Sequence, residues 1–265
     1  MPRCIRLLVA FDGGGYQGWQ RQLQGPTVQG ELERRLATLC RHPVTVHGAG
    51  RTDAGVHTLG MVAHFHTERT MPLIAFFKGL NALLPADIRI LHAAEAPTGF
   101  HSRFDAWGKT YRYDFCTAEV QLPSTRLYEA HRPGPFDPEL IAQPLAVLVG
   151  THDFSSFERS GSRDRTATHG RGAARTLYRV DCLPQPGRAD CWSIRFTGDG
   201  FLRQMVRILS GTLIEMGQGK RSAMDMKAIL AARDRSRAGP AAPACGLFLE
   251  EIYYHNPFTG SPPPT

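Results

Sequence analysis

Hydrophobic and polar residues alternate along the chain with two distinct periods, and the periods follow one another in a regular order. A period of 3.6 residues predicts a helix with one buried stripe, and a period of two predicts a strand with one buried face. Along the first part of the chain these patterns predict the order β-α-β-β-α-β. The expected strands are 4–11, 44–48, 61–67 and 87–95, and the expected helices are 27–40 and 72–84.

The same order recurs in the rest of the chain, although the residues of the two halves do not match. The expected strands are 109–115, 175–183, 191–198 and 246–254, and the expected helices are 137–150, 200–217 and 224–234. Two such halves predict an α+β fold of two ferredoxin-like units with antiparallel sheets, and a ligand site in the cleft between them. We expect an N-terminal half at 1–106, a C-terminal half at 107–255 and a disordered Pro- and Gly-rich tail at 256–265.

Composition and charge narrow the class of partner. Of the 265 residues, 42% are hydrophobic, which is enough for one large core or two small ones. The net charge of +7 and the pI of about 9.3 favour a polyanionic partner such as nucleic acid. All but four of the 31 basic residues are arginines, and arginine suits forked phosphate contacts and stacking on bases.

The sequence lacks the features of membrane proteins, secreted proteins and cysteine-based metal or redox proteins. No apolar run approaches the ~20 residues that a membrane helix needs, and the N-terminus lacks the cleavage site of a signal peptide. We therefore expect a cytoplasmic protein. The six cysteines are scattered without a C-x-x-C pair, which predicts free thiols and neither a zinc ribbon nor a redox motif.

Two motifs suggest ligands that the surrounding sequence does not support. Gly13, Gly15 and Gly18 have the G-x-G-x-x-G spacing of a dinucleotide-binding loop, but the next helix begins too late for that fold. A glycine-rich turn is the favoured interpretation. His64 and His66 share a strand face, yet no metal-ligand motif surrounds them, so hydrogen-bonded structural histidines are favoured over a metal site.

An arginine-rich segment, 159–175, lies among glycine, serine and threonine in the second half. It fits a flexible basic flap over a nucleic acid. It fits a solvated loop equally well, because its composition has few residues that could form a core.

Asp53 is the carboxylate with the most unusual surroundings. An aspartate beside glycine is ordinarily a turn former or a helix cap. Here glycines at positions 48, 50, 55 and 60 let the backbone approach a ligand closely, and Arg51 is two residues away. The loop joins two strands expected to be central in the first sheet, which makes Asp53 a candidate reacting group.

The second half offers possible partners for this carboxylate. Arg203 and Arg207 are predicted one helical turn apart on a shared face. A positive charge in the first turn of a helix interacts unfavourably with the helix dipole. Arg203 is therefore expected to form an ion pair with a carboxylate. In strand 109–115, Tyr111, Tyr113 and Phe115 share one face, most of which is expected to be core, with one tyrosine near the strand start placed to reach a cleft.

Eight segments in one order resemble the tRNA pseudouridine synthases of the A type, over nearly the whole chain. The most specific is GRTDAGVH, and the others include FDGGGYQGWQRQ, FHSRFDAWGKTYRY and GFLRQMVR. The resemblance implies the pseudouridine synthase fold, with two α+β halves around a central basic cleft. It further implies a homodimer that works without metal or cofactor on the tRNA anticodon arm, isomerising uridines at positions 38, 39 and 40.

The resemblance also assigns roles to residues. Asp53 is implied to be the catalytic aspartate and nucleophile, Tyr111 the active-site tyrosine, and Arg203 the basic residue that pairs with the aspartate. Arg51 resembles the arginine that assists base flipping, and we expect Arg207 to bind substrate as well. Whether the carboxylate attacks the sugar C1′, the base C6 or a sugar proton stays open.

Two other function classes remain compatible with the residues alone. An RNA-binding module without catalysis would bind tRNA and leave it unchanged. A metal-dependent hydrolase would use Asp53 with His57 or His64 and would lose activity with a chelator.

Overall fold

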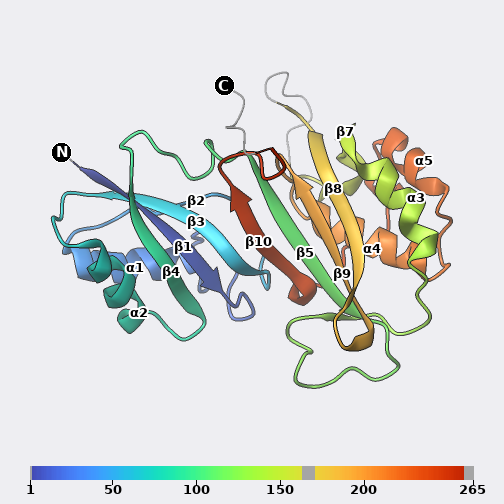
Figure 1. Ribbon diagram of the computed structural model, residues 1–265, viewed down its shortest axis with the longest axis horizontal. Helices are drawn as coiled ribbons and strands as arrows, with labels where there is room; N and C mark the ends of the chain where they lie inside the picture. Colours follow the sequence, from blue (N-terminus) through green and yellow to red (C-terminus); the bar gives the residue numbers. More distant parts are fainter. Residues whose placement is uncertain (1, 163–170, 260–265) are drawn as a thin grey trace. The chain divides into compact units, whose positions relative to one another are not determined.

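The computed structural model describes residues 2–162 and 171–259. The chain forms two compact units, one made of residues 1–109 and 248–265 and the other of residues 110–247 (Figure 1). The predicted halves, 1–106 and 107–255, stay a prediction; in the structure, residues 248–259 group with the first unit. Among the described residues, no helix is both long and apolar enough to cross a membrane.

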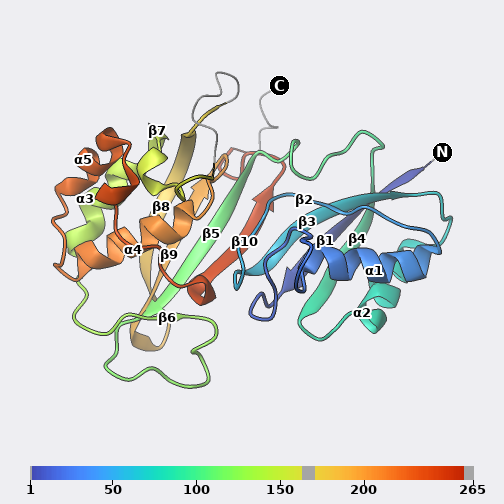
Figure 2. The ribbon, with the colours of Figure 1, turned by 180° about the vertical axis from the view of Figure 1, so that it is seen from behind.

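The first unit is a sheet with two helices on one face (Figures 1 and 2). Its strands lie in the order β4-β1-β3-β10; β1 runs antiparallel to both neighbours, β10 runs parallel to β3, and β2 pairs with β3. A π-helical turn, Ala75–Gly79, leads into α2. The elements are β1 (Arg3–Phe11), α1 (Val28–Cys40), β2 (His47–Gly48), β3 (His57–Thr67), α2 (Leu80–Leu83), β4 (Ile88–Ala96) and β10 (Leu247–Tyr253).

The core of the first unit follows from the predicted periods. Alternate residues of β1, such as Leu7, are fully buried, and so are Leu32 and Leu36 on the apolar stripe of α1. The Thr27 hydroxyl accepts a hydrogen bond from the Gly30 amide at 3.3 Å and so caps α1. This packing fixes one face of the sheet, and the loops at the ends of the strands carry the candidate site.

The second unit combines a sheet with three helices. Its strands lie in the order β5-β9-β8-β7, and β6 pairs with β5 in parallel. Helix α3 packs against α4 and α5 (Figure 2). The elements are β5 (Gly108–Cys116), β6 (Ala130–His131), α3 (Glu139–Leu148), β7 (Gly150–Asp153), β8 (Ala174–Gln185), β9 (Arg188–Gly198), α4 (Met205–Gly217) and α5 (Asp225–Ala232), with 3-10 turns at Ser155–Phe157, Arg235–Arg237 and Ala244–Gly246.

The predicted α+β class is confirmed, and the differences are local. The antiparallel expectation fails for β10 with β3 and for β6 with β5, which pair in parallel. Helix α3 includes Pro144, a residue that ordinarily kinks or breaks a helix. Of the tail expected to be disordered, residues 256–259 form a turn closed by the Thr259 amide and the Asn256 carbonyl at 3.3 Å; residues 260–265 lie outside the described part.

Candidate active site

Asp53 lies on the loop that joins β2 to β3, as the sequence predicted. Its side chain is half-buried, and the neighbouring Arg51 side chain is exposed. The Val56 amide donates to the Asp53 carbonyl at 3.2 Å, which closes a tight turn after the aspartate. Gly55 takes a left-handed φ of 76° inside this turn, a conformation that favours glycine.

Residues 12–19 form a second loop, the supporting loop, which is hydrogen-bonded to residues 49–56, the aspartate loop that contains Asp53. The Trp19 amide donates to the Thr52 carbonyl at 3.2 Å, and the Gly55 amide donates to the Tyr16 carbonyl at 3.3 Å. The Trp19 side chain is 2% exposed, so it anchors this second loop in the core. The backbone on both sides of Asp53 is therefore held by main-chain hydrogen bonds.

The glycine run explains how the two loops come so close. At Gly18, whose φ is 90°, a Cβ would lie 2.3 Å from the Thr52 carbonyl oxygen. At Gly13 a Cβ would lie 2.0 Å from the Val56 carbonyl oxygen. No side chain fits at either distance, so the run is a packing device for the aspartate loop. The sequence analysis saw only a turn here, because spacing alone does not reveal which backbone lies opposite a glycine.

His57, the first residue of β3, also contacts the loop of residues 12–19. Its Nδ1 accepts a hydrogen bond from the Gly13 amide at 3.1 Å, and its ring stacks on Phe248 with centroids 4.9 Å apart. The ring is 2% exposed. The same Nδ1 also lies 3.0 Å from an Asp12 carboxylate oxygen, so this side of the ring is held by residues 12 and 13.

His64 is buried among other histidine rings, with the His47 and His101 ring centroids at 5.1 and 4.8 Å. Its Nδ1 contacts the amide and the hydroxyl of Ser102 at 3.2 and 3.0 Å. Burial, followed by repulsion from His101, His47 and His66, lowers the pKa of His64 to about 4. The ring is therefore uncharged at neutral pH, and its Nδ1 is bonded to Ser102, which is compatible with the predicted hydrogen-bonded structural histidine.

In the second unit, Tyr111 lies on β5 and is 8% exposed. Its ring meets Phe201 edge to face, with centroids 5.0 Å apart. Phe201 begins the segment that contains Arg203, whose side chain is exposed. Within the second unit, Tyr111 therefore lies beside the segment that contains Arg203. The two residues are about 90 positions apart in the sequence, so their proximity could not be read from spacing.

The predicted helical face shared by Arg203 and Arg207 is wrong. Helix α4 begins only at Met205, and Gln204 before it takes a left-handed φ of 61°. Arg203 therefore lies in a turn, where its carbonyl accepts the Arg159 amide at 3.0 Å. Arg207 is in the helix, and its Nε donates to the Ala242 carbonyl at 2.8 Å, which fastens the segment before β10.

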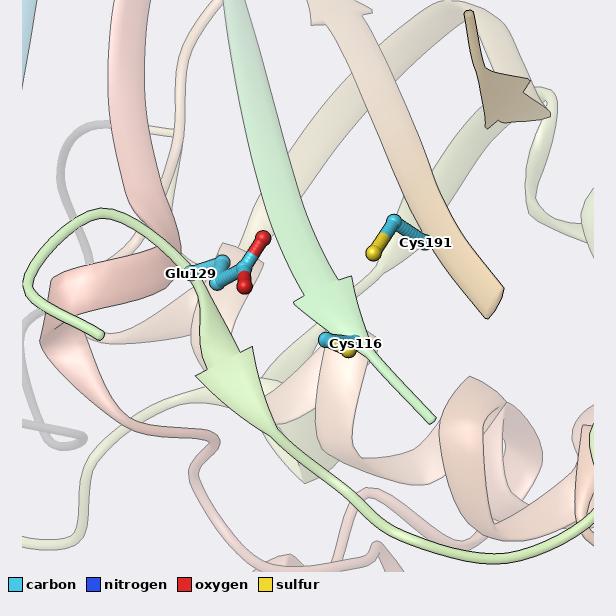
Figure 3. Close-up of side chains that lie close together, drawn as sticks. All are labelled: Cys116, Glu129 and Cys191. Carbon is cyan, nitrogen blue, oxygen red and sulfur yellow. The ribbon is translucent and has the colours of Figure 1, made fainter. Parts of the chain in front are cut away.

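Three metal-ligand types meet elsewhere in the second unit. The sulfur atoms of Cys116 and Cys191 and a carboxylate oxygen of Glu129 lie within 4.8 Å of one another, around the end of β5 (Figure 3). All three side chains are buried. No other group of this kind occurs in residues 2–162 and 171–259.

The surroundings of Glu129 account for this group without a metal. Arg188 donates through both terminal nitrogens to the two carboxylate oxygens, at 2.5 and 2.9 Å, and the Thr125 hydroxyl donates to one of them. Burial alone raises the pKa of Glu129, but these bonds outweigh it and leave the pKa below its ordinary value. Burial raises the pKa of the Cys191 thiol to about 12, so the sulfur stays protonated beside the ion pair.

The arginine-rich segment is described only at its ends. Residues 163–170 lie outside the described part of the chain. At the C-terminal end, Arg171 donates to Asp199 at 2.6 Å. Both interpretations of the segment therefore stay as they were predicted.

Comparison with known proteins agrees with the sequence motifs. The family model described as tRNA pseudouridine synthase matches residues 7–105 and 145–255. Among curated proteins, tRNA pseudouridine synthase A 1 of Desulfotalea psychrophila is 48% identical over 95% of this chain and 100% of its own length. The tRNA pseudouridine synthase A proteins of Geobacter sp. strain M21 and Clostridium tetani are 44% and 40% identical, over 95% and 96% of this chain and 99% and 100% of their own.

A solved structure, a Cbf5-Nop10-Gar1 complex, is 16% identical over 79% of this chain and 45% of that chain. Its TM-score of 0.32 is too low to support an argument. The family model and the curated relatives suffice, since they span both units and include the motif around Asp53. The chain belongs to the tRNA pseudouridine synthase family, and it is an isomerase of that family.

Proposed function

We propose that the protein isomerises uridine to pseudouridine at positions 38, 39 and 40 of the tRNA anticodon stem-loop. The names of relatives that are 40 to 48% identical support tRNA as the substrate. The main structural support for the reaction is Asp53. Its carboxylate is half-exposed, and its loop is held by main-chain hydrogen bonds to Tyr16 and Trp19. Such a group is positioned in advance, and fixed position is what covalent catalysis requires.

The reaction breaks the N1–C1′ glycosidic bond, turns the base and joins C1′ to C5. C5 loses a proton, and N1, released from the sugar, carries one in the product, so atoms and electrons balance. Asp53 acts first, as a nucleophile at C1′ or at C6 or as a base that removes a sugar proton. Because a base is needed again at the end, the same carboxylate takes the C5 proton.

Three further side chains act on the same uridine. Arg203 pairs with the Asp53 carboxylate and keeps it ionised as water leaves the site. Tyr111 stacks on the flipped base, and Arg51 fills the gap that the base leaves in the RNA. Extrusion of a uridine costs a few kcal/mol, and less in a loop than inside a stem.

Arg207 binds the RNA backbone, with its Nε bond to Ala242 holding the guanidinium in place. The protein acts as a homodimer in the cytoplasm, without metal or cofactor. Recognition of the RNA by shape suits a surface with a net charge of +7 and allows several neighbouring uridines to be modified.

The test is to incubate the protein with unmodified tRNA in the presence of a chelator and to map pseudouridine at each position. We expect pseudouridine at 38, 39 and 40, undiminished by the chelator. Asp53→Asn should bind the tRNA and form none. Asp12→Asn is a control for the loop that supports Asp53, because it neutralises a carboxylate 3.0 Å from His57 Nδ1 and keeps the oxygen that accepts the Gly14 amide.

Each alternative gives a different result. Tight binding without pseudouridine in the wild-type protein would favour an RNA-binding module. Activity lost with the chelator would favour a metal-dependent hydrolase. Substantial pseudouridine formation by Asp53→Asn would overturn the assignment of the nucleophile.

A further inference from the structure

Phe104 is an aromatic side chain held out in solvent, 75% exposed. It lies on the segment between β4 and β5, which we call the Phe104 loop (residues 98–105). Isolated exposed apolar side chains are common on protein surfaces. Phe104 differs from those because its loop is rigid and because its neighbours are aromatic and cationic.

Hydrogen bonds within the loop fix the position of the ring. The His101 amide donates to an Asp105 carboxylate oxygen at 2.8 Å, and the Asp105 amide donates to the His101 carbonyl at 3.1 Å. The Phe104 amide itself donates to Nδ1 of His101 at 3.3 Å. The backbone that carries the ring therefore cannot turn to bury it.

The loop is also tied to the rest of the first unit. The Ser102 hydroxyl donates to the His47 carbonyl on β2 at 2.8 Å, and the Tyr254 hydroxyl donates to the Ser102 carbonyl at 2.7 Å. The buried ring of His64 accepts the Ser102 amide. These three anchors come from β2, β3 and the chain after β10, so the loop is part of the folded unit.

The surroundings of the ring match the chemistry of a nucleotide. The His101 ring lies 4.2 Å from the Phe104 ring, tilted by 31°, and the Arg103 guanidinium carbon is 5.8 Å from its centroid. Most of the Phe104 ring is still accessible to a further planar group. Aromatic rings beside arginine are the usual platform for an unpaired base and its phosphate.

We propose that Phe104 is a stacking platform for an unpaired base of the RNA substrate, with Arg103 contacting an adjacent phosphate. This inference rests on the proposed function, since it names a contact that the tRNA makes outside the reacting residues. The ligand class is an unpaired nucleotide in a loop or at the end of a stem. A paired base offers no open face to the ring.

The distance between the Phe104 loop and Asp53 limits which part of the RNA Phe104 can contact. Ser102 is bonded to His47, and His47 precedes Asp53 by six residues, which span at most roughly 22 Å. The stacked base therefore belongs to the same stem-loop as the target uridine. A contact with a distant arm of the tRNA would require a longer reach.

The net charge and the neighbouring arginine favour RNA over a protein partner. An apolar pocket of a protein would accept any large apolar side chain at this position, whereas a base requires a flat ring. This difference gives the test its main variants. Phe104→Tyr keeps the flat ring, Phe104→Leu keeps only the apolar character, and Phe104→Ala removes both.

The experiment measures the Kd of each variant for an anticodon stem-loop RNA, together with kcat and KM for pseudouridine formation on tRNA. We expect Phe104→Ala to weaken binding about 10- to 100-fold and to raise KM, with kcat nearly unchanged. Phe104→Tyr should match the wild-type protein, and Phe104→Leu should resemble Phe104→Ala. Leu91→Ala, an exposed apolar side chain on β4 of the same unit, is the matched control.

Two further measurements complete the test. A stem-loop with 2-aminopurine in place of loop bases should show quenching that Phe104→Ala removes at one position. Arg103→Gln should lower the slope of log Kd against log salt by about one.

Unchanged binding by Phe104→Ala, or full rescue by Phe104→Leu, would overturn the stacking platform. The proposed function is tested separately in the wild-type protein. Binding without pseudouridine formation would refute that function, and the quenching result would still decide the role of Phe104.

Discussion

Asp53 in the first unit and Glu129 in the second are carboxylates in contrasting surroundings. Glu129 is 2% exposed, and both of its oxygens accept hydrogen bonds from Arg188. Asp53 is half-exposed, and the bonds that position it are made by the backbone of its loop. Glu129 therefore has both carboxylate oxygens bonded to Arg188 within the fold, whereas the backbone of the Asp53 loop is fixed by main-chain hydrogen bonds.

The comparison shows that the identity of nearby residues is a poor guide to chemistry. Glu129 lies close to two cysteines and an arginine, which suggests a reactive or metal-binding group. Its hydrogen bonds instead make it a buried ion pair that stabilises the end of β5. Asp53 has mainly glycine and small residues around it, and its rigid, accessible placement is what suits catalysis.

Neutralising each carboxylate without changing its shape should separate the two roles most strongly. Glu129→Gln leaves the Arg188 charge without its partner and should lower the free energy of unfolding by about 3 kcal/mol. Asp53→Asn should change it by no more than about 0.5 kcal/mol. Urea unfolding measures both, and pseudouridine assays of the folded proteins should show the opposite order, with a loss above about 10³-fold only for Asp53→Asn. Equal stability losses would contradict the contrast.

A methyl group behind the aspartate loop tests whether backbone packing positions Asp53. Gly18→Ala places a Cβ against the Thr52 carbonyl at a left-handed φ, and it should cost about 1–3 kcal/mol of stability and lower kcat. Gly15→Ala in the same loop meets nothing within 4 Å and should have neither effect. Thermal unfolding and single-turnover rates provide the measurements. Normal turnover in Gly18→Ala would show that the supporting loop is dispensable.

Two tyrosines on β5 extend the same comparison to neutral groups. Tyr113 is fully buried and donates to the Pro243 carbonyl at 3.0 Å, so Tyr113→Phe should lower stability by about 1 kcal/mol and leave kcat unchanged. Tyr111→Phe should lower kcat by about tenfold and leave the Kd for tRNA unchanged. Near-normal turnover in Tyr111→Phe would leave stacking as the whole role of that ring.

An effect of pH on stability is expected through the buried histidine cluster. The folded protein holds the pKa of His64 at about 4, below the ordinary value of 6.5, so unfolding takes up a proton between these values. The stability contributed by neutral His64 is complete above pH 6.5 and is lost as the pH falls toward 4. His47, His66, His101 and Asp105 act on the same ring. Urea unfolding at pH 7 and pH 5 should show a larger decrease for the wild-type protein than for His64→Gln.

Much of the local structure was accessible from the sequence. The 3.6-residue stripe of α1 and the alternation in β1 and β3 predicted elements that the structure contains, because burial of one face dictates where apolar residues recur. Predictions failed where tertiary contacts override the pattern. The helix expected from residue 200 begins at Met205, because Gln204 adopts a left-handed conformation that periodicity does not report.

The sequence by itself determined the α+β class, the family and the loop on which Asp53 lies, since these follow from periodicity and from motifs in a fixed order. Only the tertiary structure decided what surrounds each group. It placed Gly18 against the backbone of Thr52, surrounded Glu129 with Arg188 and Thr125, and left the ring of Phe104 in solvent. These outcomes depend on which distant segments meet in space, and spacing along one chain carries no record of that.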